Sequence, residues 1–148
     1  SWAKSVDGVG DAKCLPLWNG AGTVKVIIVD SEKQLAGSEL INKVQSYIDE
    51  QCPIGADVTV TTATTVSINV TFSADVDEST IESIKANIRN YLRDVSFANG
   101  YVSYAKIGQT ILNTDGVDDY SNLKINSKTE NITISETEIA VLGGVAVG

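Results

Sequence analysis

Two glycine-rich segments, residues 7–11 and 19–23, could direct backbone N–H groups toward a phosphate. A phosphate-binding loop of this kind follows a strand and opens a helix, or it ends in Gly-Lys-Ser/Thr. The first segment has no strand before it and no third glycine that opens a helix, and its flanking aspartates would repel phosphate. The second leads into a strand and lacks the lysine. Both segments are therefore interpreted as turns.

Three neighbouring carboxylates, Asp115, Asp118 and Asp119, could supply oxygen ligands for calcium. They lack the alternating register and the distal glutamate of an EF-hand loop, so a solvated turn is favoured and no metal or cofactor is expected. A carboxylate pair for glycoside hydrolysis stays open, because 19 acidic residues always allow some pair at the needed separation. Aromatic residues form only 6% of the chain, which leaves few platforms for a sugar cleft.

The 148-residue chain contains no histidine. This excludes Ser-His-Asp and Cys-His nucleophile systems and metal sites built on imidazole, which removes much of the known chemistry of enzymes. The net charge of −8 repels phosphate backbones, so nucleic acid is not expected as a partner. A hydrophobic content of 43% with 20% charged residues is typical of a globular domain.

The sequence also contains no methionine, although an intact reading frame begins with one. We therefore expect a processed product or, preferably, an excised piece of a longer protein. The longest apolar stretch, residues 139–147, has nine residues where about 20 are needed to span a bilayer. Membrane insertion is therefore not expected.

Two cysteines and two tryptophans are the remaining unusual side chains. Cys14 and Cys52 show no CxxC spacing; two reduced thiols are favoured, and a single disulfide between them stays open. Trp2 and Trp18 are the candidate interface residues, because tryptophan is enriched at binding hot spots. Packing of both rings against their own domain is the more ordinary interpretation.

Hydrophobic periodicity predicts the elements in the first half of the chain. Residues 24–29 form an apolar β-branched run, which predicts a strand covered on both faces. Residues 38–50 have one apolar helical face, with Ser38 as the predicted N-cap. Residues 57–74 alternate with a period of two, which predicts two strands linked near Ala63 and Thr64, or one long bent strand.

Two helices are predicted next. Residues 79–82, Ser-Thr-Ile-Glu, form a capping box that opens a helix running to about residue 95. Ser103 begins a shorter helix. The residues predicted to face inward are Ile81, Ile84, Ile88, Tyr91 and Leu92 in the first helix and Tyr104, Ile107, Ile111 and Leu112 in the second.

The last part of the chain is predicted to form strands at residues 117–125, 131–134 and 139–147, with a turn at 126–128. In residues 139–147 both parities are apolar, so this strand must be covered on both faces or left at a sheet edge. An internal strand of the domain's own sheet is favoured over an arm that docks onto a neighbour. Gly143 and Gly144 mark a bulge or a close approach of another backbone.

This order of elements predicts an α+β fold. Its centre is a βαββα ferredoxin-like unit, with both helices on one face of an antiparallel or mixed sheet, followed by an additional helix and β-strands. Residues 1–22 are predicted to be an irregular arm, or the end of a preceding domain. Residues 23–148 are predicted to form one compact α+β domain.

Several short motifs occur in a recognisable order: Trp-Asn-Gly-Ala-Gly-Thr-Val-Lys-Val at 18–26, Cys-Pro-Ile-Gly-Ala-Asp-Val-Thr-Val at 52–60, and Tyr-Leu at 91–92. The chain then closes on Asn-Ile-Thr-Ile at 131–134 and Glu-Ile-Ala-Val-Leu-Gly at 138–143. In this order the sequence resembles the carboxy-terminal part of the baseplate J-like family, the tail baseplate wedge proteins of contractile-tailed bacteriophages, prophages and phage-tail-like bacteriocins. The likeness covers essentially the whole chain. Cys52 departs from the basic residue common in the family before the Pro-x-Gly turn.

The resemblance implies a structural protein that acts through protein–protein assembly in a tail baseplate wedge, with no enzymatic activity, catalytic residues or cofactor to carry over. It implies that the partners are other wedge and hub proteins and further copies of the chain. The implied location is a virion or tail-like particle assembled in the bacterial cytoplasm. Residues 23–148 would then be the baseplate wedge domain.

Two other classes of function stay open. A carbohydrate- or receptor-binding module of a surface protein would need exposed aromatics or a calcium loop. A small enzyme using carboxylates on a ferredoxin-like fold would show its activity in a hydrolase panel, with loss on removal of single acidic side chains.

Overall fold

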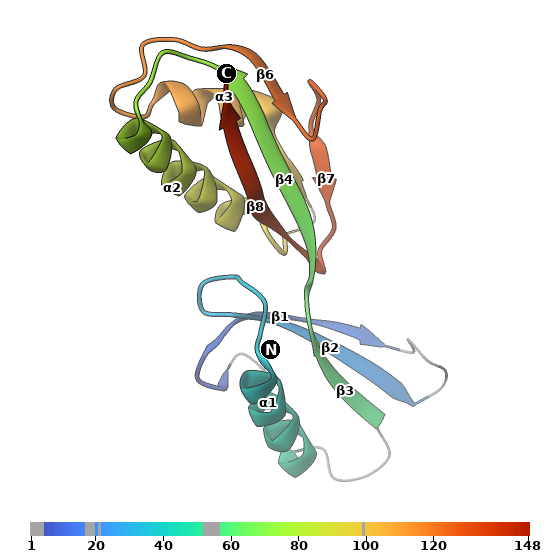
Figure 1. The fold of residues 1–148 in the computed structure, drawn as a ribbon. Coiled ribbons are helices and arrows are strands. Elements are labelled where there is room, and N and C mark those ends of the chain that lie inside the picture. Colours follow the sequence, from blue (N-terminus) through green and yellow to red (C-terminus); the bar gives the residue numbers. More distant parts are fainter. Residues whose placement is uncertain (1–4, 17–19, 21, 52–56, 99) are drawn as a thin grey trace. The chain divides into compact units, whose positions relative to one another are not determined.

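The computed structural model describes residues 5–16, 20, 22–51, 57–98 and 100–148 of the chain. This part contains eight strands and three helices, which confirms the α+β class (Figure 1). The chain divides into two compact units, Ser1–Thr64 and Thr65–Gly148. Each unit has its own hydrophobic core.

The first unit is a three-stranded sheet with one helix. In chain order it contains β1 (Val9–Pro16), β2 (Thr23–Asp30), α1 (Ser38–Gln51) and β3 (Asp57–Thr62). The strand order is β1-β2-β3, with β1 antiparallel and β3 parallel to β2. A parallel pair needs a crossover, and α1 provides it by packing against the sheet (Figure 1).

The core of the first unit lies between α1 and one face of this sheet. The four consecutive residues 26–29 of β2 are all buried, which confirms the predicted strand covered on both faces. The fully buried helix residues are Val44 and Ile48, one turn apart on α1. The buried core residues are Val6, Val26, Ile28, Ala36, Val44, Ile48 and Val60.

The prediction of an irregular arm over residues 1–22 needs correction, because Val9–Pro16 form β1 and pair with β2 along its length. The polar composition of this segment hid the strand, since its stabilising partner is the backbone of β2. The register shifts between Val9 and Asp11. At the intervening Gly10, a side chain would collide with the backbone carbonyl of Asp30, so this glycine permits close strand approach.

The second unit has two small sheets and two helices. It contains β4 (Thr64–Ser73), α2 (Glu78–Val95), β5 (Gly100–Val102), α3 (Tyr104–Leu112), β6 (Ser121–Ile125), β7 (Ile132–Ile134) and β8 (Glu138–Val147). One sheet has the order β6-β4-β8, and β5 pairs with β7 in the other. β6 is antiparallel to β4, whereas β8 runs in the same direction as β4 (Figure 1).

The helices of the second unit pack their apolar faces onto the β6-β4-β8 sheet. As predicted, Ile84 and Ile88 of α2 are fully buried and share a core with Ile68 and Val70 of β4. Val60 belongs to the core of the first unit instead, and Val58 packs against that core. The prediction that Leu112 faces inward is wrong, because this side chain is 44% exposed.

Gly108 takes an inward position on α3 that was not predicted. It is buried, and a Cβ there would collide with the hydroxyl end of Tyr120. The absent side chain leaves room for the Tyr120 ring, which meets Phe72 edge-on with ring centroids 6.3 Å apart.

The predicted N-cap residue is correct for one of the three helices. Ser103 is the N-cap of α3, and its hydroxyl accepts the Lys106 N–H at 3.1 Å, as predicted. Ser38 is the first residue of α1 itself. The N-cap of α2 is Asp77, whose carboxylate accepts the Thr80 N–H at 2.8 Å, and Ser79 lies within the helix. The helix begins two residues earlier than predicted, and the Asp77 carboxylate bonds to its third residue, Thr80, as an N-cap does.

The predicted βαββα unit does not form a single sheet. Residues 57–74 form two strands separated at Ala63, as one prediction had it, but β3 joins β2 in the first unit and β4 joins β6 and β8 in the second. The ferredoxin-like arrangement and the single domain over residues 23–148 are replaced by two units. Apolar and polar residues alternate on both sides of Ala63, so periodicity alone does not show that a boundary between two units lies there.

The final strands agree in part. β8 lies in the unit's own sheet, as predicted, and the chain turns at residues 126–128, where Asn126 and Ser127 have positive φ angles of 51° and 64°. The strand predicted from residue 117 begins at Ser121. The three-residue strand β5 was not predicted, and it pairs with β7.

Candidate functional site

The motifs that could do chemistry are placed as follows. Asp115, Asp118 and Asp119 are exposed after α3, and the Asp119 carboxylate accepts the N–H of Tyr120 at 2.9 Å. Across the part of the chain that the structure describes, no three His, Cys, Asp or Glu side chains lie close enough together to hold a metal ion. Gly8, Gly20 and Gly22 of the two glycine-rich segments have positive φ angles, which are typical of turns.

Trp2, Trp18 and Cys52 lie outside the described residues, so the interface expected at the two tryptophans stays a prediction. The thiol of Cys14 is exposed and is not in a disulfide. None of the helices in residues 22–51, 57–98 and 100–148 is long and apolar enough to cross a membrane.

A small pocket of about 240 Å³ lies between the end of α2, β5 and the start of α3. Tyr101, which is 54% exposed, stands at this pocket together with the charged residues Asp94 and Lys106. The Tyr91 hydroxyl oxygen accepts the backbone N–H of Ser103 at 2.8 Å and connects α2 to the start of α3. Sequence reasoning missed Tyr101, because its exposure depends on the short strand β5.

The phenol of Tyr91 is held in its neutral form. Burial has the largest effect and raises the pKa of Tyr91 above its usual range. The hydrogen bond from the Ser103 N–H acts in the opposite direction, and the nearby Tyr101 and Asp94 add smaller increases. A neutral phenol that accepts a backbone N–H positions two helices, and it is not an activated nucleophile.

The outer edge of β3 in the first unit is closed by a side chain of α1. The Gln45 amide nitrogen donates to the carbonyl of Val58 at 3.0 Å, and its oxygen accepts the N–H of Val60 at 3.0 Å. One residue of a parallel neighbouring strand would make the same two bonds. The side chain thus substitutes for a strand at this edge.

Among the described residues, hydrogen bonds close the outer edge of β8 in the second unit only at its beginning. The N–H of Phe97 donates to the carbonyl of Glu138 at 2.7 Å, and the N–H of Ala140 donates to the hydroxyl of the buried Ser96 at 2.8 Å. The same hydroxyl donates to the carbonyl of Leu92 at 2.7 Å, near the end of α2. β8 therefore starts against the end of α2.

β8 contains a change of parity at its two glycines. The residues of β8 that pack on the core are Ala140, Leu142, Val145 and Val147, so the spacing is two, three and two. This spacing agrees with the predicted bulge at Gly143 and Gly144. A Cβ on Gly143 would collide with the side-chain amide of Asn69 in β4, so the close neighbour is a side chain and not another backbone.

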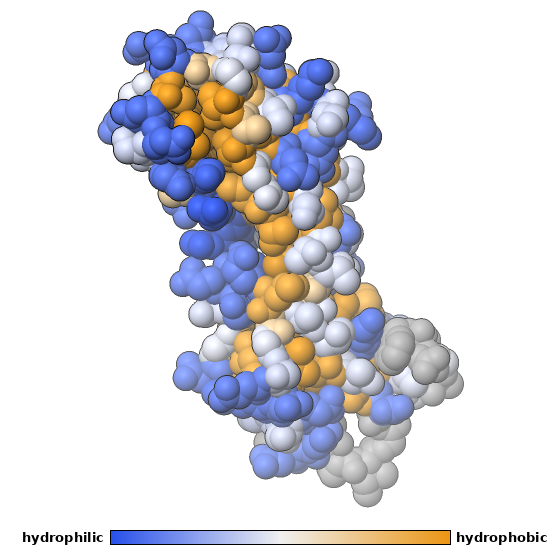
Figure 2. Space-filling model, in the orientation of Figure 1, coloured by the Kyte–Doolittle hydropathy of each residue, from blue (hydrophilic) through white to orange (hydrophobic). Residues whose placement is uncertain are grey.

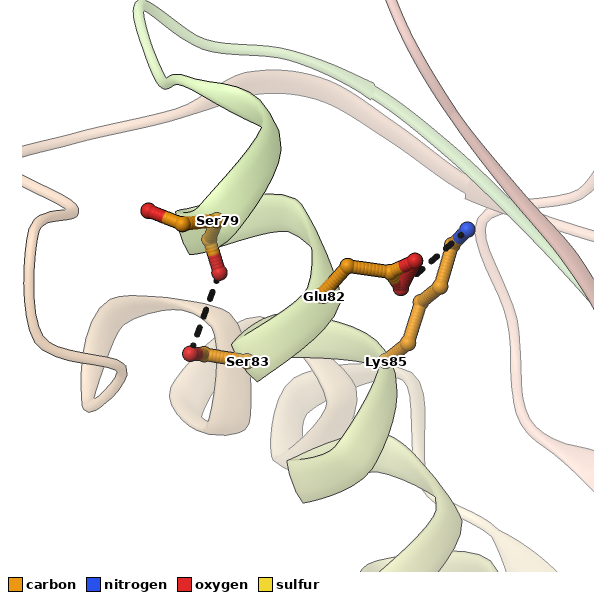
Figure 3. Close-up of polar contacts among 4 residues, drawn as sticks. All are labelled: Ser79, Glu82, Ser83 and Lys85. Atoms are coloured by element: carbon orange, nitrogen blue, oxygen red, sulfur yellow. Dashed lines mark hydrogen bonds and ion pairs between the residues drawn. The ribbon is translucent and has the colours of Figure 1, made fainter.

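The surfaces beside β8 differ in polarity. Figure 2 shows hydrophobic surface over the second half of β8 and the side of α2 next to it, while the rest of α2 is hydrophilic. Figure 3 shows part of that hydrophilic face: the Ser83 hydroxyl donates to the carbonyl of Ser79 at 3.2 Å, and Lys85 pairs with Glu82 at 3.5 Å. Such exposed contacts contribute little to stability.

Two family models match consecutive parts of the chain. The model of the Baseplate J-like central domain matches residues 1–62, and that of the Baseplate J-like protein C-terminal domain matches residues 64–148. The chain belongs to the Baseplate J-like family. The two matches meet where the structure divides into two units.

Two proteins of Bacillus subtilis (strain 168) are similar in sequence. The phage-like element PBSX protein XkdT is 38% identical over 159 residues, which cover 99% of this chain and 45% of that protein. The uncharacterized protein YqbT is 37% identical over 160 residues, with the same coverage of 99% and 45%. The chain thus spans a little under half the length of these relatives.

A solved structure shows the same fold at low sequence identity. A chain in the cryo-EM structure of the anti-feeding prophage (AFP) baseplate matches with a TM-score of 0.57 and 7% identity. The match covers 91% of this chain and 34% of that chain.

Proposed function

We propose that the chain is a structural component of the tail baseplate wedge of a phage or phage-like particle and acts through protein–protein assembly. The observation that carries this proposal is the match of consecutive Baseplate J-like domains to the two structural units. The similarity to a phage-like element protein and the fold shared with a chain of a prophage baseplate support it. The proposed partners are other wedge and hub proteins and further copies of the chain.

We also propose that the chain has no enzymatic activity. The absence of histidine removes the common nucleophile systems, and the acidic residues 115, 118 and 119 are exposed after α3. The proposed location is the virion or tail-like particle, assembled in the bacterial cytoplasm. The interface role of Trp2 and Trp18 belongs to the same proposal.

The test is cellular. The full-length parent protein, tagged in the producing bacterium, should sediment with tail-like particles after induction. Recovery only in the culture medium, as a free disulfide-linked monomer, would contradict the proposal.

One observation favours a second candidate, a carbohydrate- or receptor-binding module. Tyr101 is an exposed aromatic beside a pocket that also contains an acid and a lysine. A glycan array probed with the chain, and again with Tyr101→Ala, tests this candidate. Binding that the variant loses would support it, and the absence of binding would remove it.

A further inference from the structure

The second half of β8 is an edge strand whose outward backbone has no strand beside it. In the part of the unit that the structure describes, β4 is the only strand next to β8 in its sheet. The N–H of Gly148, just after β8, donates to the carbonyl of Phe72 in β4 at 2.9 Å, so backbone groups of this parity face β4. Val147 and Val145 have the opposite parity to Gly148, so their backbone N–H and C=O groups face away from β4.

Two residues before the glycines also direct their backbone groups outward. Ala140 directs its N–H outward to Ser96, and Leu142 has the same parity, so it also faces outward. We call the outward backbone groups of Leu142, Val145 and Val147 the open edge. The side chains of these three residues are partly buried and pack on the core beneath α2 and α3.

The other edge strands of the two three-stranded sheets have features that block pairing with another strand, and the open edge lacks these features. β3 is closed by Gln45. β1 contains a bulge, carries Lys13 and ends at Pro16. β6 is short, contains Lys124 and is bridged back on itself between Ile125 and Lys128. β8 has ten residues, and none after Glu138 is charged or proline. Natural proteins rarely leave a long apolar edge uncovered.

We propose that the open edge binds an extended segment of a different protein, which adds a strand to the β6-β4-β8 sheet. This inference deepens the proposed function and rests on it, because the partner is expected in the particle that the proposed function describes. Strand addition uses main-chain hydrogen bonds for affinity and alternate side chains for specificity. The backbone of Leu142, Val145 and Val147 supplies the bonds, and the hydrophobic surface between β8 and α2 receives the alternate side chains (Figure 2).

The chemistry of the partner follows from its neighbours. Side chains on its helix-facing side are apolar, because they extend the core formed by Leu142, Val145 and Val147. Side chains on its other side lie beside Gly143, Gly144 and Ala146, which leave that face open. Acidic residues outnumber basic ones by 11 to 6 in residues 65–148, so the segment is neutral or basic.

The experiment compares variants of the tagged full-length parent protein in the producing bacterium. Val145→Pro removes an outward N–H, and the preceding Gly144 tolerates the backbone that proline requires. Ala146→Lys places a charge beside the edge from an exposed position without changing the core. Thr71→Lys, from an exposed position on the central strand β4, is the matched control. Melting of each chain checks that it folds.

We expect Val145→Pro and Ala146→Lys to lower recovery in sedimenting particles by about tenfold or more, which corresponds to about 1.4 kcal/mol. Thr71→Lys should leave recovery unchanged. If wild type and both edge variants are folded and are all recovered in the particles, this inference is overturned and the proposed function stays intact. Absence of wild type from the particles would instead overturn the proposed function, and this inference with it. Should Val145→Pro fail to fold, Ala146→Lys decides the outcome.

Amide hydrogen exchange provides a second readout. In the 148-residue chain, the amides of Leu142, Val145 and Val147 should exchange quickly, whereas that of Gly148 should be protected. Slow exchange at the open edge would contradict the proposal. Self-association of the chain that Val145→Pro abolishes would show that a second copy occupies the edge, which also overturns the proposed partner.

Discussion

The two units complete their outer strands in different ways. In the first unit, Gln45 reaches from α1 and makes the two hydrogen bonds that a parallel neighbour of β3 would make. In the second unit, Ser96 and Phe97 serve only the first residues of β8. The difference teaches that one unit satisfies its edge internally while the other leaves an edge for association.

The cores differ as well. The core of the first unit joins a parallel strand pair to one helix, and that of the second joins two helices to a mixed sheet. Because the two sets of buried residues are separate, we expect a core change in one unit to leave the other folded.

The largest expected effect comes from Ile84→Ala in α2. The fully buried isoleucine leaves a cavity, and the loss should be about 2–5 kcal/mol of unfolding free energy for the second unit. Hydrogen exchange followed by mass spectrometry should show faster opening in residues 65–148 and unchanged protection in β2 and α1.

The control is Lys85→Ala, which removes the exposed ion pair with Glu82 shown in Figure 3 and should cost less than about 0.5 kcal/mol. Equal effects from both variants would show that α2 faces the other way. Loss of protection in both units after Ile84→Ala would show that they unfold together, which would contradict the expectation of two independent cores.

The next largest effect is expected at Ser96, which ties the end of α2 to β8. Ser96→Ala leaves the buried N–H of Ala140 without its acceptor, so the second unit should lose about 1–3 kcal/mol. Ser83→Ala removes a similar hydroxyl-to-carbonyl bond from an exposed turn of the same helix and should cost less than about 0.5 kcal/mol. Denaturant unfolding of the two variants measures the difference; similar losses would mean that burial at Ser96 has no special effect.

Gln45→Ala tests the closed edge of the first unit. The carbonyl of Val58 and the N–H of Val60 would become accessible to water, so the loss should be modest, about 1 kcal/mol. Asn42→Ala, at an exposed position of α1, is the control. The variant should also self-associate more at high concentration, as light scattering would detect. Unchanged exchange of the Val60 amide would contradict the role of Gln45.

The smallest effect concerns the start of α2 and depends on pH. Hydrogen bonds from the backbone N–H and hydroxyl of Thr80 and from the Ser79 hydroxyl hold the pKa of Asp77 below its usual range. The charged carboxylate therefore stabilises the second unit above the unfolded-state pKa, and this contribution is lost as the pH falls through the lower folded-state value.

Asp77→Asn should flatten the acid side of the stability profile measured by melting. Ser79→Ala should keep most of the pH dependence, because Thr80 supplies the larger contributions. A stability that no longer depends on acid pH in Ser79→Ala, together with a normal pH dependence in Asp77→Asn, would show that Ser79 is the N-cap.

Much of the fold could be predicted from periodicity, because long amphipathic or fully apolar segments carry a clear pattern. The β2 run and the inward faces of α1 and α2 follow from the spacing of their apolar residues. β1 could not be predicted, since Asp11, Lys13 and Cys14 give no apolar alternation and its pairing is made by the backbone. The boundary near Ala63 was hidden because the strands on each side share one period.

The candidate site was harder to predict than the fold. Residues 139–147 were recognised as apolar on both parities, but the direction of each backbone group depends on which strand lies beside β8 and on the bulge at its glycines. Gln45 gives no signal in the sequence, because a glutamine on a helix is ordinary. The exposure of Tyr101 depends on a pairing of three residues with β7. Topology therefore determines the site, and composition does not.

The position of β8 in the sheet has a consequence for the order of folding during synthesis. β2 and β3 are joined through α1 alone, so the first unit can complete its sheet soon after residue 62 has emerged from the ribosome. β4 pairs with β8 only after two helices and three strands, α2, β5, α3, β6 and β7, have been made. Contacts so distant in sequence close slowly. The nascent second unit therefore leaves the β8-facing edge of β4 unpaired for longest, and this is where we expect a chaperone to bind.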